Sequence, residues 1–148
     1  IKKADYAISN ACIEDIEYHP DRHLDKGQIV RLSTCNYIQE YHNVIILGAT
    51  GSGKTYISNA LGMAASRNFY SVKYIRLPDL LNELAIARGD GTFRKVMKQY
   101  KQVKLLILDE WLIFDLKERR GIYSKSSSKG TKEHPQSSVP NLMLPAGI

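Results

Sequence analysis

The chain has 148 residues, of which 43% are hydrophobic, with a formal net charge of +6 and two cysteines. This length suits one ordinary domain, and the composition excludes collagen, a disulfide-stapled scaffold and a wholly disordered chain. No apolar run approaches the ~20 residues that a membrane-spanning helix needs. The N-terminus leads into no apolar signal segment, so we expect a cytoplasmic protein with reduced thiols.

The first half of the chain predicts two helices separated by a strand. Asp25 is a residue type that caps helix N-termini, and the apolar spacing after it predicts a helix to about Glu40. Residues 44–47 form a short apolar run that is typical of a buried strand and ends at a glycine. Residues 55–67 are rich in Ala and Leu and predict a helix.

The second half of the chain continues the alternation of strands and helices. Residues 72–76 alternate apolar and basic side chains, as a strand does. A helix follows from Pro78 to about Arg88, and a further helix covers residues 92–102. Residues 103–108 are typical of a fully buried strand. The order strand, helix, strand, helix, helix, strand predicts an α/β fold with a parallel sheet covered by helices.

A phosphate-binding motif lies between the first strand and the helix after it. The residues fit G-x-x-x-x-G-K-[ST], and they are Gly48, Ala49, Thr50, Gly51, Ser52, Gly53, Lys54 and Thr55. Glycines let backbone N–H groups surround phosphate oxygens, and the helix N-terminus adds donors. We expect these residues and Tyr56 to bind a nucleotide, Lys54 to contact the β- and γ-phosphates and Thr55 to ligate Mg²⁺. The alternative is a glycine-rich turn that matches by accident.

Two carboxylates end the last predicted strand. Asp109 and Glu110 follow an apolar run, which places them at the carboxyl edge of the sheet, where ligands of open α/β folds bind. We expect Asp109 to hold Mg²⁺ and Glu110 to orient or deprotonate the attacking water, with Lys54 as the other catalytic residue. The alternative for Glu110 is a solvated carboxylate past the strand end.

Basic residues are concentrated between the second and third predicted strands. The candidates for DNA contacts are Arg88, Arg94, Lys95, Lys98 and Lys101. Arg94, Lys98 and Lys101 share one helix face by their spacing. An ordinary solvated helix face explains them as well as contacts to a phosphate backbone do.

These motifs and their surroundings resemble the IstB-like ATP-binding proteins, which are AAA+ relatives of the DnaC-type helicase loaders. The resemblance covers residues 1–118, most clearly residues 41–48, 70–78 and 105–111. It implies a three-layer αβα P-loop NTPase, with residues 1–40 leading into an ATPase core at residues 41–118. It also implies ATP and Mg²⁺ as cofactors, DNA and a transposase or replicative helicase as partners, and a homo-oligomer.

The resemblance stops near Glu118. Residues 117–148 hold six Lys and Arg against two Glu, so +4 of the net +6 lies there, and the stretch is rich in Ser and Pro. We predict that residues 119–148 are an irregular tail. The sensor-1 strand, arginine finger and sensor-2 region of the family are not recognisable in it. Another reading frame of permitted codons gives a family-like continuation, so the hypothesis is truncation or a frameshift.

Such a tail predicts that the sheet lacks its sensor-1 strand and is incomplete at the C-terminus. Loss of the sensor and the arginine finger also predicts that nucleotide binding survives better than turnover.

The leading function is an ATP-binding AAA+ helper of DNA transposition or replication that acts as an ATPase. The alternatives are another P-loop enzyme, such as a small-molecule kinase, and a DNA-binding module that binds ATP but is catalytically impaired. The sequence does not choose between transposase and helicase, and it gives neither an oligomer number nor a DNA sequence preference. It leaves the adenine pocket open, with residues 13–18 and the start of the helix after Asp25 as candidate walls.

Overall fold

A computed structural model describes residues 4–110 and the backbone of residues 141–147. Its elements are η1 (Pro20–Arg22), α1 (Lys26–Ser33), α2 (Asn36–Gln39), β1 (Val44–Gly48), α3 (Lys54–Arg67), β2 (Val72–Arg76), α4 (Leu77–Gly89), α5 (Phe93–Lys101), β3 (Leu105–Asp109) and β4 (Asn141–Gly147). Every element predicted between residues 44 and 109 is confirmed to within two residues. In this described part of the chain, no helix is both long and apolar enough to cross a membrane.

The predicted helix over residues 25–40 is two helices. Asp25 caps α1 as expected, because its Oδ1 accepts the backbone N–H groups of Gly27 at 2.7 Å and Gln28 at 3.3 Å. The single-helix prediction is wrong at Cys35, whose φ of 64° lies in the left-handed region. Cys35 is buried there, and the Asn68 side chain donates to its sulfur at 3.8 Å. Apolar spacing alone predicts one continuous helix through residue 35, whereas in the folded chain the left-handed backbone at this buried residue separates α1 from α2.

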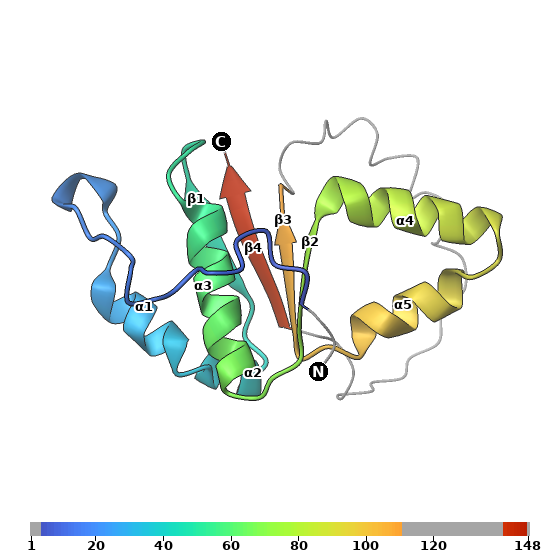
Figure 1. Ribbon diagram of the computed structural model, residues 1–148, viewed down its shortest axis with the longest axis horizontal. Coiled ribbons are helices and arrows are strands. Elements are labelled where there is room, and N and C mark those ends of the chain that lie inside the picture. Colours follow the sequence, from blue (N-terminus) through green and yellow to red (C-terminus); the bar gives the residue numbers. More distant parts are fainter. Residues whose placement is uncertain (1–3, 111–140, 148) are drawn as a thin grey trace.

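The four strands form one parallel sheet in the order β1-β4-β3-β2 (Figure 1). In the pairing of β1 with β4, Val44 lies opposite Met143 and Gly48 opposite Gly147. In the pairing of β2 with β3, Arg76 lies opposite Asp109. The predicted parallel sheet is therefore confirmed, and both motif-bearing strands end at the same edge.

The strand β4 corrects the prediction of a wholly irregular tail and of a sheet without a strand at this position. Asn141–Gly147 lies between β1 and β3 and pairs in parallel with both. Proline is a poor residue for a central strand because it lacks an N–H group. Pairing with β3 ends at Met143, however, so Pro145 lies where β4 pairs with β1 alone. Residues 119–140 lie outside the described part.

Helix α3 packs across one face of the sheet (Figure 1). Leu61 and Ala65 of α3 and Leu105 and Ile107 of β3 have essentially no exposed surface. Gly62 permits this approach, because a Cβ there would lie 2.6 Å from Cδ1 of Ile107. This contact fixes the P-loop helix against the strand that ends in Asp109.

The opposite face of β1 is open. Ile45 is 55% exposed and Leu47 is 68% exposed, although both belong to a strand of the parallel sheet. Of the three layers expected, the described residues therefore show the sheet and the α3 layer, while this part of the second face is uncovered.

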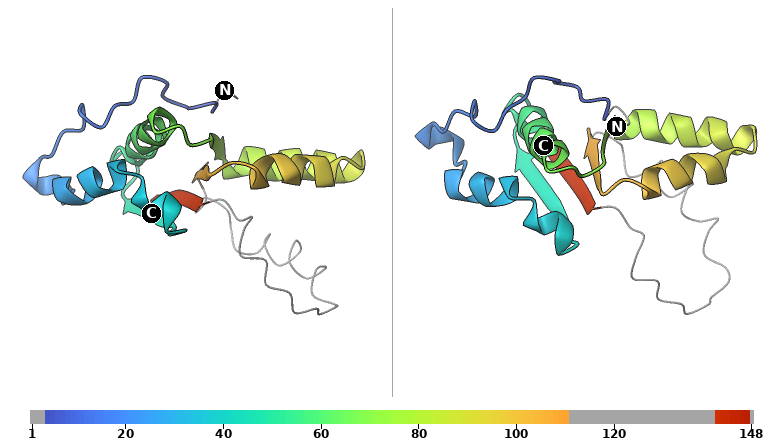
Figure 2. Two further views of the ribbon diagram at one scale, coloured as in Figure 1. Left: turned by 90° about the horizontal axis from the view of Figure 1, so that it is seen from below. Right: turned by 60° about the horizontal axis from the view of Figure 1, so that its bottom comes forward.

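Helices α4 and α5 form a hairpin that projects from the β2 side of the sheet (Figure 2). Tyr100 of α5 is buried, and its hydroxyl donates to the Glu83 carboxylate of α4. The guanidinium of Arg88 lies 4.9 Å from the centre of the Phe93 ring. These contacts hold the two helices together away from the core.

The close approach at Gly62 predicts that a larger residue at this position destabilises the protein. Gly62→Ala should lower the free energy of unfolding by about 1–3 kcal/mol, because the new methyl group meets Ile107 and Tyr6 in a packed core. Gly89→Ala is the control, since a Cβ there meets nothing within 4 Å. That change should leave stability unaltered or raise it by up to about 1 kcal/mol. Urea unfolding of the two variants measures this, and equal effects would contradict the packing of α3 on β3.

Candidate functional site

The loop between β1 and α3 has the conformation that its glycines were predicted to provide. Gly51 has a φ of 78° and Gly53 has a φ of 86°, values that other residues rarely adopt. A Cβ on Gly48 would lie 2.8 Å from the Ser52 Oγ, so the loop curls closely over the end of β1. Helix α3 begins directly after it, at Lys54. The backbone of the loop and the N-terminus of α3 therefore form one continuous set of amide groups.

Lys54 folds back over this loop. Its Nζ donates to the carbonyl oxygen of Gly48 at 2.8 Å and to that of Ala49 at 2.6 Å. The two carbonyl groups hold the ammonium group at the loop, where oxygen atoms of a phosphate can replace them as acceptors. The side chain is thus already placed beside the amides of the loop.

Thr55 and Asp109 meet across the site. The Thr55 Oγ1 donates to the Asp109 Oδ2 at 2.8 Å, and Asp109 is only 6% exposed. Carboxylate and hydroxyl oxygens are the hard ligands that Mg²⁺ takes. The Thr55 oxygen keeps lone pairs beside the proton that it donates, so this donor set fits a magnesium ion. The contact joins residues that are 54 positions apart in the chain, and it brings the P-loop motif together with the carboxylates at the end of β3.

Glu110 lies next to Asp109 with its backbone in the left-handed region. Its φ is 58°, and its N–H donates to the Asp109 Oδ1 at 2.8 Å. The Glu110 carboxylate lies 3.7 Å from the Arg76 guanidinium, which also binds Asp79 at 2.8 Å. The hydrogen bond to Asp79 raises the pKa of Arg76 further above its usual range. Arg76 is a neighbour of Glu110 that the sequence reading did not assign to the site.

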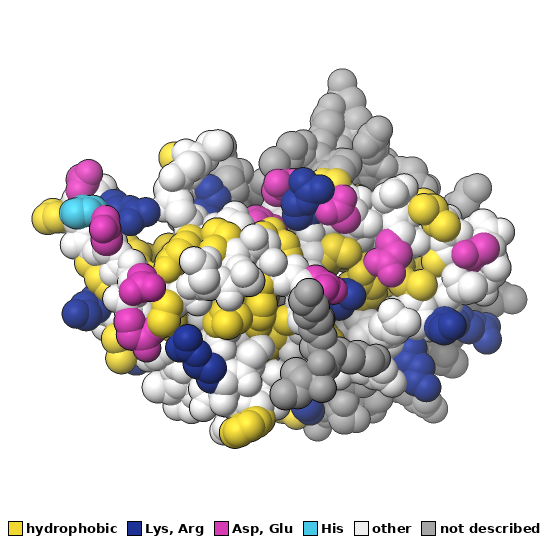
Figure 3. Space-filling view, in the orientation of Figure 1, with side chains coloured by type: hydrophobic (Ala, Val, Ile, Leu, Met, Phe, Trp, Pro, Cys, Tyr) yellow, Lys and Arg dark blue, Asp and Glu magenta, His cyan; other side chains and the backbone are white. Residues whose placement is uncertain are grey.

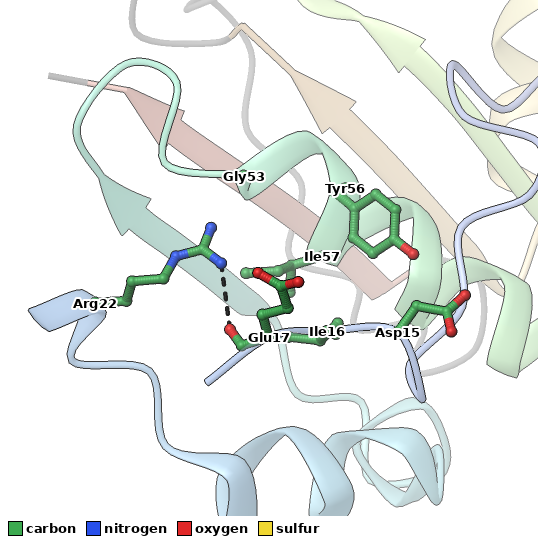
Figure 4. Close-up of a pocket in the computed structure, with 7 residues that line it drawn as sticks. All are labelled: Asp15, Ile16, Glu17, Arg22, Gly53, Tyr56 and Ile57. Atoms are coloured by element: carbon green, nitrogen blue, oxygen red, sulfur yellow. Dashed lines mark hydrogen bonds between the residues drawn. The ribbon is translucent and has the colours of Figure 1, made fainter. Parts of the chain in front are cut away.

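A pocket of about 190 Å³ lies beside the start of α3 (Figure 4). Its lining comes from the N-terminal segment, the P-loop and the first turn of α3, namely Asp15, Ile16, Glu17, Arg22, Gly53, Tyr56 and Ile57. It includes three of the residues at positions 13–18 that the sequence offers as walls, but none of the described residues at the start of α1, the other candidate wall.

Arg22 and Tyr56 tie this N-terminal segment to the P-loop. The Arg22 guanidinium donates to the Ser52 carbonyl at 2.9 Å and to the Glu17 carbonyl at 3.2 Å. The Tyr56 hydroxyl accepts the Cys12 N–H at 3.2 Å. No motif marks Arg22, which lies in the short η1 turn and reaches the loop only in the folded chain.

Tyr74 is a third residue, after Arg76 and Arg22, that the sequence did not assign to the site. It lies on β2 and is 7% exposed, and its hydroxyl donates to the Asp109 Oδ2 at 2.8 Å. Burial and then the hydrogen bond to Asp109 raise the pKa of Tyr74, which keeps the phenol protonated. In the pairing of β2 with β3, Arg76 lies opposite Asp109. Tyr74 is two residues before Arg76, so its side chain lies on the same face of the sheet as that of Asp109. Only the pairing of the strands shows that the two residues are close.

The basic residues predicted to contact DNA lie on the hairpin, away from the P-loop. Arg94, Lys95, Lys98 and Lys101 belong to α5 and are exposed, and Arg88 is exposed near the end of α4. Lys and Arg side chains gather along the α5 side of the hairpin (Figure 3). The structure therefore brings the five candidates onto one projecting unit.

Comparison with known proteins matches the part of the chain that contains the P-loop and the Asp109 strand. The sequence profile of a family described as IstB-like ATP binding protein matches residues 1–123. An ATP-binding protein of insertion sequence IS1162 from Pseudomonas fluorescens is 41% identical over 117 residues, which is 79% of this chain and 51% of that protein. One from insertion sequence IS232 of Bacillus thuringiensis is 32% identical over 96 residues, 65% of this chain and 38% of that protein. The chain thus spans about half the length of such curated relatives.

Solved structures share the fold at low sequence identity. AMPPCP-bound DnaA from Aquifex aeolicus has a TM-score of 0.72 at 21% identity, covering 97% of this chain and 44% of DnaA. A DnaC helicase loader has a TM-score of 0.62 at 14% identity, covering 94% of this chain and 77% of the loader. The fold is therefore that of AAA+ P-loop domains, built here with β4 in the sheet. With its P-loop joined to Asp109 through Thr55, the chain belongs to the family of IstB-like ATP binding proteins.

Proposed function

We propose that this chain binds ATP with Mg²⁺ as the nucleotide-binding part of an insertion-sequence helper protein that works on DNA. The observation that carries the proposal is the hydrogen bond between Thr55 and Asp109 at 2.8 Å, which joins the two nucleotide motifs in one site. Family membership supports ATP as the nucleotide, since the matching family is described by ATP binding.

In this proposal the phosphates lie against the loop of residues 48–55. Backbone amides of the loop and of the first turn of α3 donate to the phosphate oxygens, aided by the partial positive charge of the helix N-terminus. Lys54 leaves the Gly48 and Ala49 carbonyls and binds the β- and γ-phosphates. Thr55 and Asp109 hold Mg²⁺, which supplies charge neutralisation to the phosphate oxygens.

The base of the nucleotide belongs in the pocket between the N-terminal segment and α3. Ile16 and Ile57 offer apolar surface there, and the Tyr56 hydroxyl is anchored to the backbone of Cys12. Arg22 binds the Ser52 carbonyl, so it connects the wall of this pocket with the phosphate loop. A base held here orients the phosphates toward Lys54.

Glu110 is proposed as the residue that orients or deprotonates the attacking water. Its carboxylate lies beside Arg76 in the structure, which competes for it. The residues at the carboxyl end of β4 are Pro145, Ala146 and Gly147, residue types without a polar side-chain group, and Gly147 lies opposite Gly48. These three residues therefore supply no polar side chain that could act as a sensor at that strand end. This supports the proposal that ATP binding is retained better than ATP hydrolysis.

The hairpin of α4 and α5 is the proposed surface for DNA. The hairpin that carries these exposed Arg and Lys residues extends away from the P-loop and α3 (Figure 2), which lets a phosphate backbone approach without covering the P-loop. A DnaA structure of the same fold is bound to AMPPCP and single-stranded DNA, with a TM-score of 0.69 at 19% identity. A transposase is the proposed protein partner because the relatives belong to insertion sequences, and assembly into a homo-oligomer remains a proposal.

Removing the Lys54 charge should abolish most nucleotide binding. Lys54→Ala should weaken binding of labelled ATP about 10-fold or more, because hydrogen bonds to charged groups contribute about 1.5–3 kcal/mol each. Lys104→Ala is the matched control, since Lys104 is exposed and follows α5. Fluorescence titration measures both. Equal affinities for the two variants would contradict a nucleotide site at this loop.

Turnover should be slow even when ATP saturates the site. We expect the Mg²⁺-dependent release of phosphate by the unaltered chain to lie close to that of Glu110→Gln, because groups that stabilise transition-state charge contribute up to ~10³–10⁵ in rate. A phosphate-release assay at saturating ATP compares them. Fast hydrolysis that Glu110→Gln removes would show a competent site and refute the proposed impairment.

Loss of charge on α5 should weaken DNA binding in a salt-dependent manner. Lys98→Ala should reduce the magnitude of the negative slope of log affinity against log salt concentration by about 0.9, and the combination with Arg94→Ala and Lys101→Ala should reduce that magnitude further. Arg31→Ala removes one exposed charge from α1 and should leave the slope unchanged. Fluorescence anisotropy with a DNA oligonucleotide at several salt concentrations measures the slopes, and identical slopes would remove the hairpin from the DNA interface.

A further inference from the structure

Asp109 is held by more than the threonine of the P-loop. Its Oδ2 accepts two hydroxyl groups, one from Thr55 and one from Tyr74, both at 2.8 Å. Its Oδ1 accepts the Glu110 N–H, also at 2.8 Å. A carboxylate buried to 6% exposure needs such donors, because an unpaired buried charge is costly. Three donors, from α3, from β2 and from the backbone just after β3, therefore set the plane and direction of this one carboxylate.

The three donors differ in what they can do once a cation is present. Thr55 opens α3 and has oxygen lone pairs to give to a metal ion, and the Glu110 amide belongs to the backbone after β3. Tyr74 is anchored on a different strand, β2, where its ring is 7% exposed and packed in the core. Close packing around the ring restricts its movement, so its hydroxyl holds Asp109 from a position set by the core.

We propose that Tyr74 is a positioning residue that fixes the Asp109 carboxylate for Mg²⁺-ATP. The inference rests on the proposed function, since it concerns the same nucleotide site. Tyr74 does not touch the ligand in this proposal. Its hydroxyl occupies one side of the Asp109 Oδ2, so that the carboxylate keeps a single orientation towards Thr55. The Oδ1, which accepts only the Glu110 N–H among these donors, keeps a lone pair for the cation.

The chain contains a matched control for this interaction. Tyr100 is also buried, and its hydroxyl also donates to a carboxylate, that of Glu83, but the pair lies in the hairpin of α4 and α5. Replacing either tyrosine by phenylalanine removes one hydroxyl that donates to a carboxylate and preserves the ring; Asp109 is buried and Glu83 is half-buried. A structural effect of losing such a hydrogen bond should therefore appear in both variants, and an effect on the cation only at Tyr74.

The experiment titrates labelled ATP against the wild-type chain, Tyr74→Phe and Tyr100→Phe, in EDTA and at increasing Mg²⁺. For Tyr74→Phe we expect the Mg²⁺ concentration that gives half-maximal enhancement of ATP binding to rise about 10-fold. The affinity in EDTA should stay within about twofold of wild type, since the loop and Lys54 are unaltered. Tyr100→Phe should match wild type in both conditions. Thermal unfolding in EDTA reports the structural cost of each change separately.

A double variant separates the proposal from a general loss of folding. Asp109→Asn removes the buried charge, so Tyr74→Phe in that background leaves no unpaired carboxylate. If Tyr74 acts through Asp109, the double variant should have the same Mg²⁺ requirement as Asp109→Asn alone. A further loss in the double variant would overturn the inference.

The remaining outcomes are also decisive. An unaltered Mg²⁺ requirement in folded Tyr74→Phe, or an equal loss of affinity with and without Mg²⁺, would overturn the positioning role. Failure of the wild-type chain to bind ATP in any condition would instead refute the proposed function. The failure of one proposal is thus distinguishable from the failure of the other.

Discussion

The contact between the Thr55 hydroxyl and the Asp109 carboxylate is the constraint on which the site depends. It joins the first turn of α3 to the end of β3 over 2.8 Å, and it requires the helix to lie directly on the sheet. Gly62 allows that distance because a larger residue would meet Ile107. Packing in the core and geometry at the sheet edge are therefore linked, since any shift of α3 away from β3 also separates Thr55 from Asp109, the two proposed ligands of Mg²⁺.

The strand β4 adds a second dependence. In the described part of the sheet, β1 and β3 do not pair with each other, and β4 lies between them. The distance between the phosphate loop after β1 and the carboxylates after β3 is therefore set by one inserted strand of residues 141–147. Neighbouring parallel strands lie about 4.8 Å apart, so the insertion separates the two motif strands by about twice that spacing. The Thr55 side chain bridges this separation because α3 crosses over the inserted strand.

Much of the fold was predictable because its elements are locally encoded. Apolar runs, proline in the first turn of α4 and glycine after β1 fix the elements from residue 44 to residue 109 within two residues. The failures have physical causes. Cys35 breaks a helix because its buried side chain and left-handed backbone fit the core better than a continued helix does. The segment at residues 141–147 contains Pro145, and proline argues against a strand unless one side of the strand is unpaired there. Only the strand pairing in the structure shows that β4 pairs on one side alone at Pro145.

The sequence by itself determined the chemistry of the phosphate loop. Glycines at positions 51 and 53, Lys54 and Thr55 act through backbone conformations and side chains that are adjacent in the chain. The tertiary structure alone decided which residues support that loop from a distance. Tyr74 reaches Asp109 because β2 and β3 pair in one register, and Arg22 reaches Ser52 because the N-terminal segment folds over α3. Such contacts form only when residues far apart in the chain are brought together, and local residue patterns do not predict which residues will meet.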